Sequence, residues 1–248
     1  MDEIQKFNKY IEKGPYHWRE TEPKLGRFNP HLAARYELSL DMITRHCLTP
    51  ASILDIGCGD GVFTAMLADR YRKGRVEGFD YDATAIVLAR EMIASKDLAN
   101  LTFEEGDAFQ RAKDVGLITA TDVIEHLHDP GRFLEDSYRT LHHGGCLFLS
   151  TPIRCEEVPP DKYHFKEFEF DELRDFSMKF GFSVVDHKSS HDLTYLKRYL
   201  RIFRPGIGKL RPFKYLYSLL AIRFGNNVFK KGPCSRPTMQ YILLRKPE

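Results

Sequence analysis

The chain has 248 residues and a formal net charge of +2; 42% of its residues are hydrophobic and 29% are charged. These fractions are typical of a soluble globular protein, and the length suits one domain with additions or at most two small domains. The longest strongly apolar stretch lies near Leu216–Ile222, and it is too short to span a bilayer.

The N-terminal residues and the cysteines indicate where the protein is expected to work. Residues Met1 to Lys13 are charged and lack the apolar run of a signal peptide. The cysteines are dispersed, odd in number and without a CxxC pair: Cys47, Cys58, Cys146, Cys155 and Cys234. Such a set predicts reduced thiols in a cytoplasmic protein, and it argues against a disulfide framework or a zinc site.

Short apolar runs and helical spacing alternate along the chain. The expected strands are Ser52–Ile56, Arg75–Phe79, Leu101–Glu105, Val115–Ala120, Cys146–Ser150, Phe182–Asp186 and Gln240–Arg245. The expected helices are Val62–Tyr71, Ala83–Ser95, Pro130–Leu141 and Asp171–Phe180. We expect Gly144 and Gly145 to stop the third helix, and Asp171 to cap the fourth. Strands that alternate with helices predict a doubly wound α/β sheet.

The segment between the sixth and seventh strands is unusually long and basic. Residues 191–236 contain eleven Lys or Arg and one acid, Asp192, so they carry +10 and leave about −8 on the rest of the chain. One helical face should hold Leu193, Leu196, Leu200 and Phe203, and another Lys197, Arg201 and Arg204. A second helix, Phe213–Phe224, is apolar almost all round.

Three interpretations of this basic segment stay open. It could be a lid or plain appendage over the sheet. It could lie on an anionic membrane surface, as basic amphipathic helices do, and reach a lipid-linked acceptor. It could also bind nucleic acid, with basic side chains on phosphates and aromatic rings on bases, which we favour less.

The first expected strand ends in closely spaced glycines, Gly57-Cys58-Gly59-Asp60-Gly61. A strand followed by glycines and a helix brings backbone N–H groups close to a ligand. The nicotinamide dinucleotide fingerprint GxGxxG would place its third glycine at Val62, and Asp60 would lie beside the pyrophosphate. Asp60 is compatible with a cationic ligand that lacks phosphate, and Asp55 at the strand end adds another negative charge close by.

Two further acids follow the second and third expected strands. Asp80, which precedes Tyr81, lies 21 residues after Gly59 and can accept hydrogen bonds from both hydroxyls of a ribose. Asp107 can accept a hydrogen bond from an adenine amino group, and Ala108 supplies a backbone N–H. Together with the glycines, these acids predict a site for an adenosyl ligand.

These three pieces, in this order, resemble the class I S-adenosylmethionine-dependent methyltransferases over about residues 52–186 plus the last strand. The resemblance implies a Rossmann-like α/β fold, with a seven-stranded, mostly parallel sheet whose last strand is antiparallel. It implies that the glycine loop holds the methionine part of the cofactor, Asp80 the ribose and Asp107 the adenine. The cofactor-binding residues implied are Asp55, Gly57, Cys58, Gly59, Gly61, Asp80, Tyr81, Asp107, Ala108, Thr121 and Arg35.

The resemblance also divides the chain. We expect a single methyltransferase domain over residues 1–248, with a helical N-terminal cap at 1–50 and the cofactor-binding core at 51–190. A basic helical insert at 191–236 and the last strand at 237–248 complete it. The cap resembles a segment that folds over the cofactor in the quinone branch, where an arginine binds the cofactor carboxylate. Arg35 is the candidate here, and Tyr16 and Trp18 could line the pocket.

The stretch Thr121–His126 follows the fourth expected strand, where substrate and cofactor should meet. It is similar to an acid-x-x-Glu-His pattern in two related branches, which methylate quinone-precursor phenols and the 2′-hydroxyl at small-RNA ends. There the pattern supplies metal ligands, completed by a later histidine. The corresponding candidates for a divalent ion are Asp122, Glu125, His126 and His164. Asp122 is shorter than the Glu of those branches, so a metal is not the favoured hypothesis.

Without a metal, Glu125, His126 and His164 are the candidate catalytic residues. His126, His128 and His164 are the candidate general bases, and the sequence does not choose among them. A structural interpretation also stands, in which Glu125 begins a helix and His126 packs or forms a hydrogen bond.

The favoured hypothesis is therefore a cytoplasmic, S-adenosylmethionine-dependent O-methyltransferase that could associate with membranes. Its expected acceptor is a small molecule, a glycan or a lipid-linked precursor. The alternative enzyme is a metal-assisted RNA 2′-O-methyltransferase. An alternative of another class is a partner protein that binds the cofactor without catalysis, and a nicotinamide dehydrogenase is disfavoured by Asp60 and Val62.

Overall fold

The computed structural model describes residues 9–155, 161, 163–206, 208–231 and 234–248. Within these ranges seven strands form one sheet: β1 (Ser52–Ile56), β2 (Arg75–Asp80), β3 (Leu101–Glu105), β4 (Val115–Thr121), β5 (Leu141–Pro152), β6 (Ser183–Asp192) and β7 (Pro237–Arg245). Their order is β3-β2-β1-β4-β5-β7-β6. β7 is antiparallel to both of its neighbours and the other pairs are parallel, which confirms the predicted sheet.

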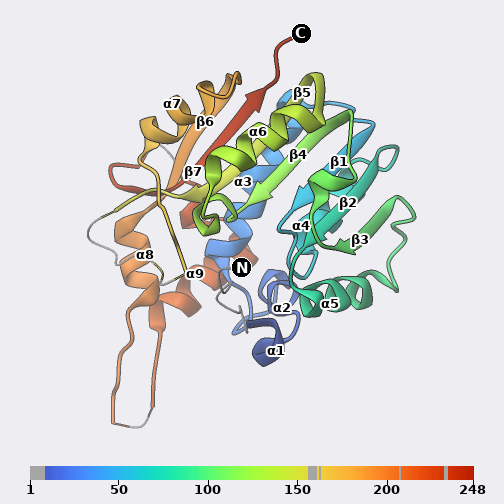
Figure 1. Ribbon diagram of the computed structural model, residues 1–248. Coiled ribbons are helices and arrows are strands. Elements are labelled where there is room, and N and C mark those ends of the chain that lie inside the picture. The colour runs from blue at the N-terminus through green and yellow to red at the C-terminus, as the bar shows by residue number, and fades with distance from the viewer. Residues whose placement is uncertain (1–8, 156–160, 162, 207, 232–233) are drawn as a thin grey trace.

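Helices cover both faces of this sheet (Figure 1). In the described residues the α-helices are α1 (Lys9–Lys13), α2 (Tyr16–Thr21), α3 (Pro30–His46), α4 (Val62–Arg70), α5 (Ala83–Ile93), α6 (Pro130–Thr140), α7 (Phe170–Met178), α8 (Leu193–Leu200) and α9 (Pro212–Phe224). Short 3-10 helices are η1 (Ala108–Gln110), η2 (Ile124–His126) and η3 (Val228–Lys230). Residues 1–8 of the expected cap lie outside the described residues.

Alternating side chains of the strands build a core on each face of the sheet. Ile53 and Leu243 pack with residues of α3, α4 and α5, whereas Leu54 and Leu244 pack with residues of α6 and α7. Successive side chains of a strand point to opposite faces, so strands covered on both faces read as continuous apolar runs. That is why the sequence identified the central strands closely.

β7 runs toward the top of the view in Figure 1, so the carboxyl ends of the parallel strands lie at the bottom. The same edge carries α1, α2 and the insert helices α8 and α9 (Figure 1). Ligands of doubly wound sheets bind at the carboxyl ends of the strands. The cap and the insert therefore lie on the edge at which a site is expected.

Several predicted boundaries were wrong. α6 ends at Thr140 and runs directly into β5, so Gly144 lies within the strand, beside a shift in the β4–β5 register, and does not stop the helix. Glu169, not Asp171, precedes α7 as its N-cap, and its N–H donates to the Glu172 carboxylate at 3.3 Å. β6 continues to Asp192 because β7 pairs with it along that length.

The insert folds as two helices joined by a hairpin, but its expected apolar face was only partly right. Leu193 is buried, whereas Leu200 and Phe203 are 50% and 40% exposed. α8 ends at Leu200, and Tyr199 takes the buried position instead. Among the described residues no helix combines the length and hydropathy that crossing a bilayer requires.

Candidate active site

The loop after β1 is fixed against the end of β2 by its own backbone. The N–H groups of Gly57 and Cys58 both donate to the Phe79 carbonyl, at 2.8 and 3.0 Å. The Gly59 N–H donates to the Asp80 carboxylate at 2.8 Å. These N–H groups, which the sequence placed toward a ligand, are thus already bonded within the protein. The loop offers a ligand close approach to a backbone without bulky side chains.

Glycine is required in this loop by conformation and by space. Gly57 and Gly61 have φ angles of +68° and +80°, which L-residues with a side chain rarely adopt. A Cβ atom at Gly57 would lie 2.5 Å from the Val123 side chain, and one at Gly61 would lie 2.5 Å from the Phe103 ring. Val123 belongs to the stretch after β4, so Gly57 brings the glycine loop against the second half of the candidate site.

Asp55 lies behind the loop. Its side chain is 1% exposed, and its two oxygens accept hydrogen bonds from the hydroxyls of Thr64 at 2.6 Å and Thr119 at 2.7 Å. Burial raises the pKa of Asp55 to about 6, and the two threonine hydrogen bonds oppose that shift. These contacts join β1, α4 and β4, so the geometry gives Asp55 a role in positioning the loop.

Asp80 and Asp107 lie at the ends of the neighbouring strands β2 and β3. Asp80 accepts from the N–H groups of Gly59 and Asp82, the latter at 2.9 Å, and burial raises its pKa. Asp107 accepts from the Phe109 N–H at 2.9 Å and so caps η1. A carboxylate oxygen has two lone pairs, so both acids retain capacity to accept from a ribose or an adenine.

The other two residues expected around the adenosine differ in burial. Ala108 is 2% exposed, and Tyr81 is 68% exposed. The Gly106 N–H donates to the Asp80 carbonyl at 3.0 Å, which ties the loop after β3 to the end of β2. The expected ribose and adenine residues therefore share one continuous edge of the sheet.

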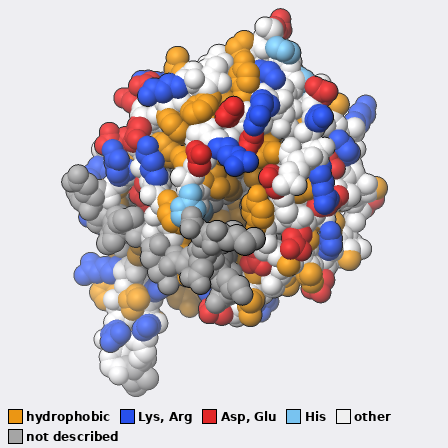
Figure 2. All heavy atoms as spheres, viewed as in Figure 1, with side chains coloured by type: hydrophobic (Ala, Val, Ile, Leu, Met, Phe, Trp, Pro, Cys, Tyr) orange, Lys and Arg blue, Asp and Glu red, His pale blue; other side chains and the backbone are white. Residues whose placement is uncertain are grey.

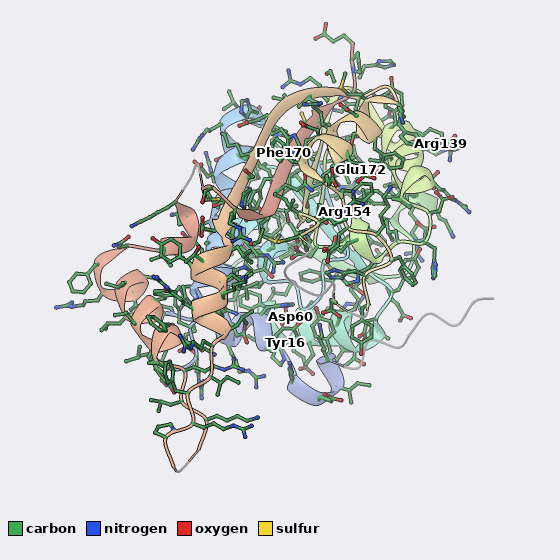
Figure 3. The ribbon with its side chains drawn as sticks, turned by 90° about the vertical axis from the view of Figure 1, so that its left-hand side faces the viewer. Tyr16, Asp60, Arg139, Arg154, Phe170 and Glu172 are labelled. Carbon is green, nitrogen blue, oxygen red and sulfur yellow. The ribbon has the colours of Figure 1, made fainter. Side chains whose placement is uncertain are left out.

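The N-terminal cap forms hydrogen bonds to Asp60, which is fully buried. Its carboxylate accepts from the His17 N–H at 3.0 Å and pairs with His17 Nδ1 at 3.0 Å, and its carbonyl accepts from Trp18 Nε1 at 2.6 Å. The Tyr10 hydroxyl lies where a side chain on Gly59 would stand. The expectation that Asp60 faces a cationic ligand is therefore not supported, because its carboxylate binds the cap. Tyr16 lies beside Asp60 in Figure 3.

Arg35 of α3 reaches the end of β4 and forms an ion pair with Asp122. Asp122 has a φ angle of +55°, and its N–H donates to the Ser150 carbonyl at 2.8 Å. Arg35 Nε and Asp122 Oδ1 are buried and have no hydrogen-bond partner among the described residues. Both atoms could therefore bind a ligand. Thr121, the last residue of β4, precedes this pair.

Three of the four candidate metal ligands come together. Glu125, His126 and His164 each offer one ligand atom, and these atoms lie within 4.8 Å of one another. The His126 and His164 rings meet edge to face, with centroids 4.8 Å apart. Asp122, the fourth candidate, is bound to Arg35 and is not part of this cluster of described residues.

Hydrogen bonds orient every member of the Glu125–His126–His164 cluster. Glu125 is 1% exposed; one oxygen accepts from the Thr151 hydroxyl at 2.9 Å, and the other is buried without a partner in the described structure. Burial raises the Glu125 pKa. His126 Nδ1 contacts the Tyr163 carbonyl at 2.9 Å, and His164 Nδ1 contacts a Glu167 oxygen at 2.6 Å.

A carbonyl and a carboxylate only accept, so both Nδ1 atoms carry the proton and both Nε2 atoms are left with a lone pair. This arrangement suits a divalent ion, because metal-binding histidines typically donate their other N–H to such acceptors. Glu125, His126 and His164 are the residues that would hold the ion. When bound, an ion supplies a Lewis acid that lowers the pKa of a hydroxyl oxygen.

The sequence did not identify the residues that orient the cluster. Thr151 lies near the end of β5, 26 residues from Glu125, and Glu167 lies before α7, three residues from His164. The short spacing of Glu167 from His164 is the one signal in the sequence that could have found an orienting residue. Arg154, just after β5, pairs with Glu172 of α7 at 3.5 Å, and both side chains are labelled in Figure 3.

A second histidine pair, in which His31 is half-buried and His191 fully buried, was also missed. His31 of α3 and His191 of β6 meet edge to face with centroids 4.6 Å apart. The Tyr241 hydroxyl lies 2.6 Å from His191 Nε2. Burial lowers the pKa of His31 to about 3 and that of His191 well below its usual value. Arg35 lowers both further, so these imidazoles are neutral.

The sheet order, the glycine loop and the acids at the strand ends define a class I methyltransferase fold. Residues 50–201 match the family described as "Methyltransferase domain". The chain belongs to this family, and the predicted family and its S-adenosylmethionine cofactor are thereby confirmed.

Three curated relatives illustrate the family. A probable S-adenosylmethionine-dependent methyltransferase of Mycolicibacterium smegmatis is 29% identical over 177 residues, 69% of this chain and 66% of that protein. A trans-aconitate 2-methyltransferase of Deinococcus radiodurans is 32% identical over 44% of this chain and 40% of that protein. A ubiquinone biosynthesis O-methyltransferase of an Azoarcus species is 29% identical, over 60% and 61% respectively.

The first curated relatives are matched over only 55 to 66% of their own length. Among solved structures, the putative methyltransferase in complex with the Haloferax volcanii Trm112 methyltransferase activator has a TM-score of 0.65 and 18% identity. It covers 100% of this chain and 99% of that chain. At this identity the likeness supports the fold.

Proposed function

We propose that the protein is an S-adenosylmethionine-dependent methyltransferase that transfers a methyl group to a hydroxyl oxygen of a small molecule. The observation that carries this proposal is the Glu125–His126–His164 cluster, in which two imidazoles keep a free Nε2 lone pair. Glu125 and His126 follow β4, and Val123 beside them contacts Gly57 of the glycine loop. A proton-accepting centre thus adjoins the loop expected to hold the methyl donor.

Methyl transfer to a hydroxyl has two requirements that these residues must meet. The acceptor oxygen must lie in line with the sulfonium methyl, so that the C–O bond forms as the S–C bond breaks and S-adenosylhomocysteine leaves. The hydroxyl proton must also pass to a base. His164 is the base we favour, because Glu167 at 2.6 Å from its Nδ1 stabilises the imidazolium that proton uptake produces.

His126 and Glu125 have supporting roles in this proposal. His126 hydrogen-bonds to a neutral carbonyl, which gives a protonated ring less support than the Glu167 carboxylate gives His164. The unpartnered Glu125 oxygen can accept from the acceptor hydroxyl and orient it. The same atoms would be ligands if a divalent ion were bound. Whether activity depends on added metal therefore distinguishes a metal-assisted route from a histidine base.

The test is methyl transfer from radiolabelled S-adenosylmethionine to panels of phenols, sugars, carboxylic acids and amines. We expect turnover on a hydroxylated acceptor, and a fall in kcat of about 100-fold or more for His164→Asn. The dissociation constant of S-adenosylmethionine should stay within about twofold. His143→Asn is the matched control, because this exposed histidine lies in β5 far from the cluster, where it contacts the Pro247 carbonyl.

Other results would contradict the proposal. A carboxylate is already ionised, so transfer to carboxylic acids with full activity in His164→Asn would exclude the base. Activity lost in EDTA and restored by Mg²⁺ or Mn²⁺, on RNA ends, would favour the RNA 2′-O-methyltransferase. Tight cofactor binding without turnover on any panel would favour a non-catalytic partner protein. The glycan and lipid-linked acceptors are tested in the same assay.

A further inference from the structure

A basic hairpin joins α8 to α9 and projects from the body of the molecule (Figure 1). It is closed by two backbone hydrogen bonds of 2.7 Å between Phe203 and Leu210. Arg201, Arg204 and Lys209 lie on it and are exposed. Figure 2 shows basic and hydrophobic side chains interleaved on this projection.

The neighbouring helix α9 presents an apolar face to solvent. Tyr215, Leu216 and Leu219 are 49%, 45% and 44% exposed. A helix turns about 100° per residue, so these three side chains lie within about 100° of one another around the helix axis. Arg223 lies on the same face. Tyr217, on the opposite face, is buried. The exposed face is therefore a continuous apolar strip that ends in a cation.

Exposed apolar side chains are concentrated in residues 200–206 and 208–224, which we call the insert surface. Eight of the fifteen exposed large hydrophobic side chains of the described chain lie there, including Phe224 at 69%. Soluble proteins rarely expose apolar residues in such density without a partner. The concentration therefore indicates a binding surface.

The charge of the insert surface identifies the kind of partner. From residue 193 to 236 the sequence contains no acid. Arg204, Lys209 and Arg223 form no ion pair with any described carboxylate. Cations interleaved with apolar side chains suit the boundary between acidic headgroups and acyl chains. The exposed apolar set is mostly aliphatic, whereas single-stranded nucleic acid favours aromatic rings on which bases stack.

Hydrogen bonds anchor the helices of the insert to the cap. The Tyr199 hydroxyl donates to the Asn29 side chain at 2.9 Å, and the Ser218 hydroxyl donates to the Phe28 carbonyl at 3.0 Å. The Asn227 amide donates to the Pro30 carbonyl at 2.8 Å. All three acceptors lie at the start of α3, the helix that carries Arg35. Both helices that flank the hairpin are thus attached to the cap at one place.

We propose that the insert surface binds peripherally to bilayers that contain anionic phospholipid. Its basic side chains contact the headgroups, and the apolar residues of the hairpin and α9 enter the boundary with the acyl chains. The surface lies at the edge of the sheet that carries the candidate active site (Figure 1), so the bound protein faces acceptors dissolved in or tethered to the membrane. The binding itself does not depend on the proposed reaction.

The experiment is co-sedimentation of the full chain with vesicles of phosphatidylcholine alone or with 30 mol% phosphatidylserine, a composition of our choosing. We expect binding to the anionic vesicles only, weakened by added salt. Each basic residue near such a surface contributes about fivefold in affinity, so Arg204→Glu/Lys209→Glu should weaken binding by about 25-fold or more. Leu216→Asn/Leu219→Asn should weaken it without changing the net charge.

The matched control is Lys73→Glu/Lys113→Glu, which changes the net charge equally at exposed positions before β2 and β4, at the opposite edge of the sheet. It should bind within about twofold to threefold of the wild type. Equal binding to neutral vesicles, no binding, or equal losses in the control would overturn the proposal. So would binding of a 20-nucleotide RNA without binding to vesicles, which would assign the surface to nucleic acid. Circular dichroism checks that each variant is folded.

Discussion

Gly61 occupies a position where conformation and space both exclude a side chain. Its φ angle is +80°, and an added Cβ would lie 2.5 Å from the Phe103 ring and 2.9 Å from Ala89. Gly144 has nearly the same φ angle, +78°, but nothing lies within 4 Å of its added Cβ. We expect Gly144→Ala to cost about 1 kcal/mol of stability through backbone strain alone. Gly61→Ala should cost about 2–4 kcal/mol because overpacking is added.

Urea denaturation of the two alanine variants measures this difference directly, since both start from the same backbone strain. Equal losses would show that Phe103 and Ala89 move aside at little cost. If Gly144→Ala lost more stability than Gly61→Ala, the tight packing around Gly61 would not determine the stability loss of Gly61→Ala.

At the residue scale the sequence predicted where side chains lie in the fold better than what they contact. Asp80 and Asp107 do lie at adjacent strand ends, because alternating strands and helices fix where each strand stops. The partners of Asp60 come from His17 and Trp18, more than forty residues away in a cap with no periodic signal. Long-range hydrogen bonds of this kind leave no local pattern, so the sequence did not predict that Asp60 binds the cap.

At the element scale, the contact between α3 and β6 should make stability depend on pH. The folded protein keeps His31 neutral down to about pH 3, whereas the unfolded chain binds a proton below about pH 6.5. Stability from this difference is present above pH 6.5 and is lost as the pH falls toward 3. Between pH 7.5 and 5.5 we expect a loss of about 1.4 kcal/mol for each buried histidine, with His191 acting in the same direction.

Urea unfolding at the two pH values tests this linkage, with His31→Gln and His191→Asn as the variants. Asn tolerates the φ angle of +65° at position 191 better than most residues do. Each variant should flatten the pH dependence by about the contribution of one histidine. A slope as steep as that of the wild type would contradict the assignment, whatever the absolute stability of the variant.

The strands β1 to β4 were predicted within a residue or so because both sheet faces are covered, which makes these strands continuously apolar. In the insert, the second helix was predicted within one residue of α9, but the apolar face of the first was only partly right. Its helical spacing suggested an apolar face through Leu200 and Phe203, but the chain leaves the helix at Leu200 and forms a hairpin. Periodicity assumes that the helix continues, so it placed Leu200 and Phe203 on an apolar face that the chain does not form.

At the scale of the whole molecule, three segments far apart in the sequence meet at one edge of the sheet. The cap contacts the glycine loop through Asp60, and the insert contacts the cap at the start of α3. The edge at which the cofactor is expected thus also carries the candidate catalytic cluster and the insert surface. From this arrangement we expect cofactor binding to depend on the position of the cap.

We therefore expect the cap to contribute to cofactor affinity. His17→Ala removes the imidazole that pairs with the buried Asp60 carboxylate, which loosens α2 over the loop. Because a hydrogen bond to a charged group is worth about 1.5–3 kcal/mol, we expect the dissociation constant of S-adenosylhomocysteine to rise about tenfold by calorimetry. Thr21→Ala is the control: this hydroxyl donates only to carbonyls of α2 itself, at 3.0 and 3.1 Å, and does not touch the loop. Unchanged affinity in His17→Ala, or an equal loss in Thr21→Ala, would show that the cap covers the loop without stabilising the bound cofactor.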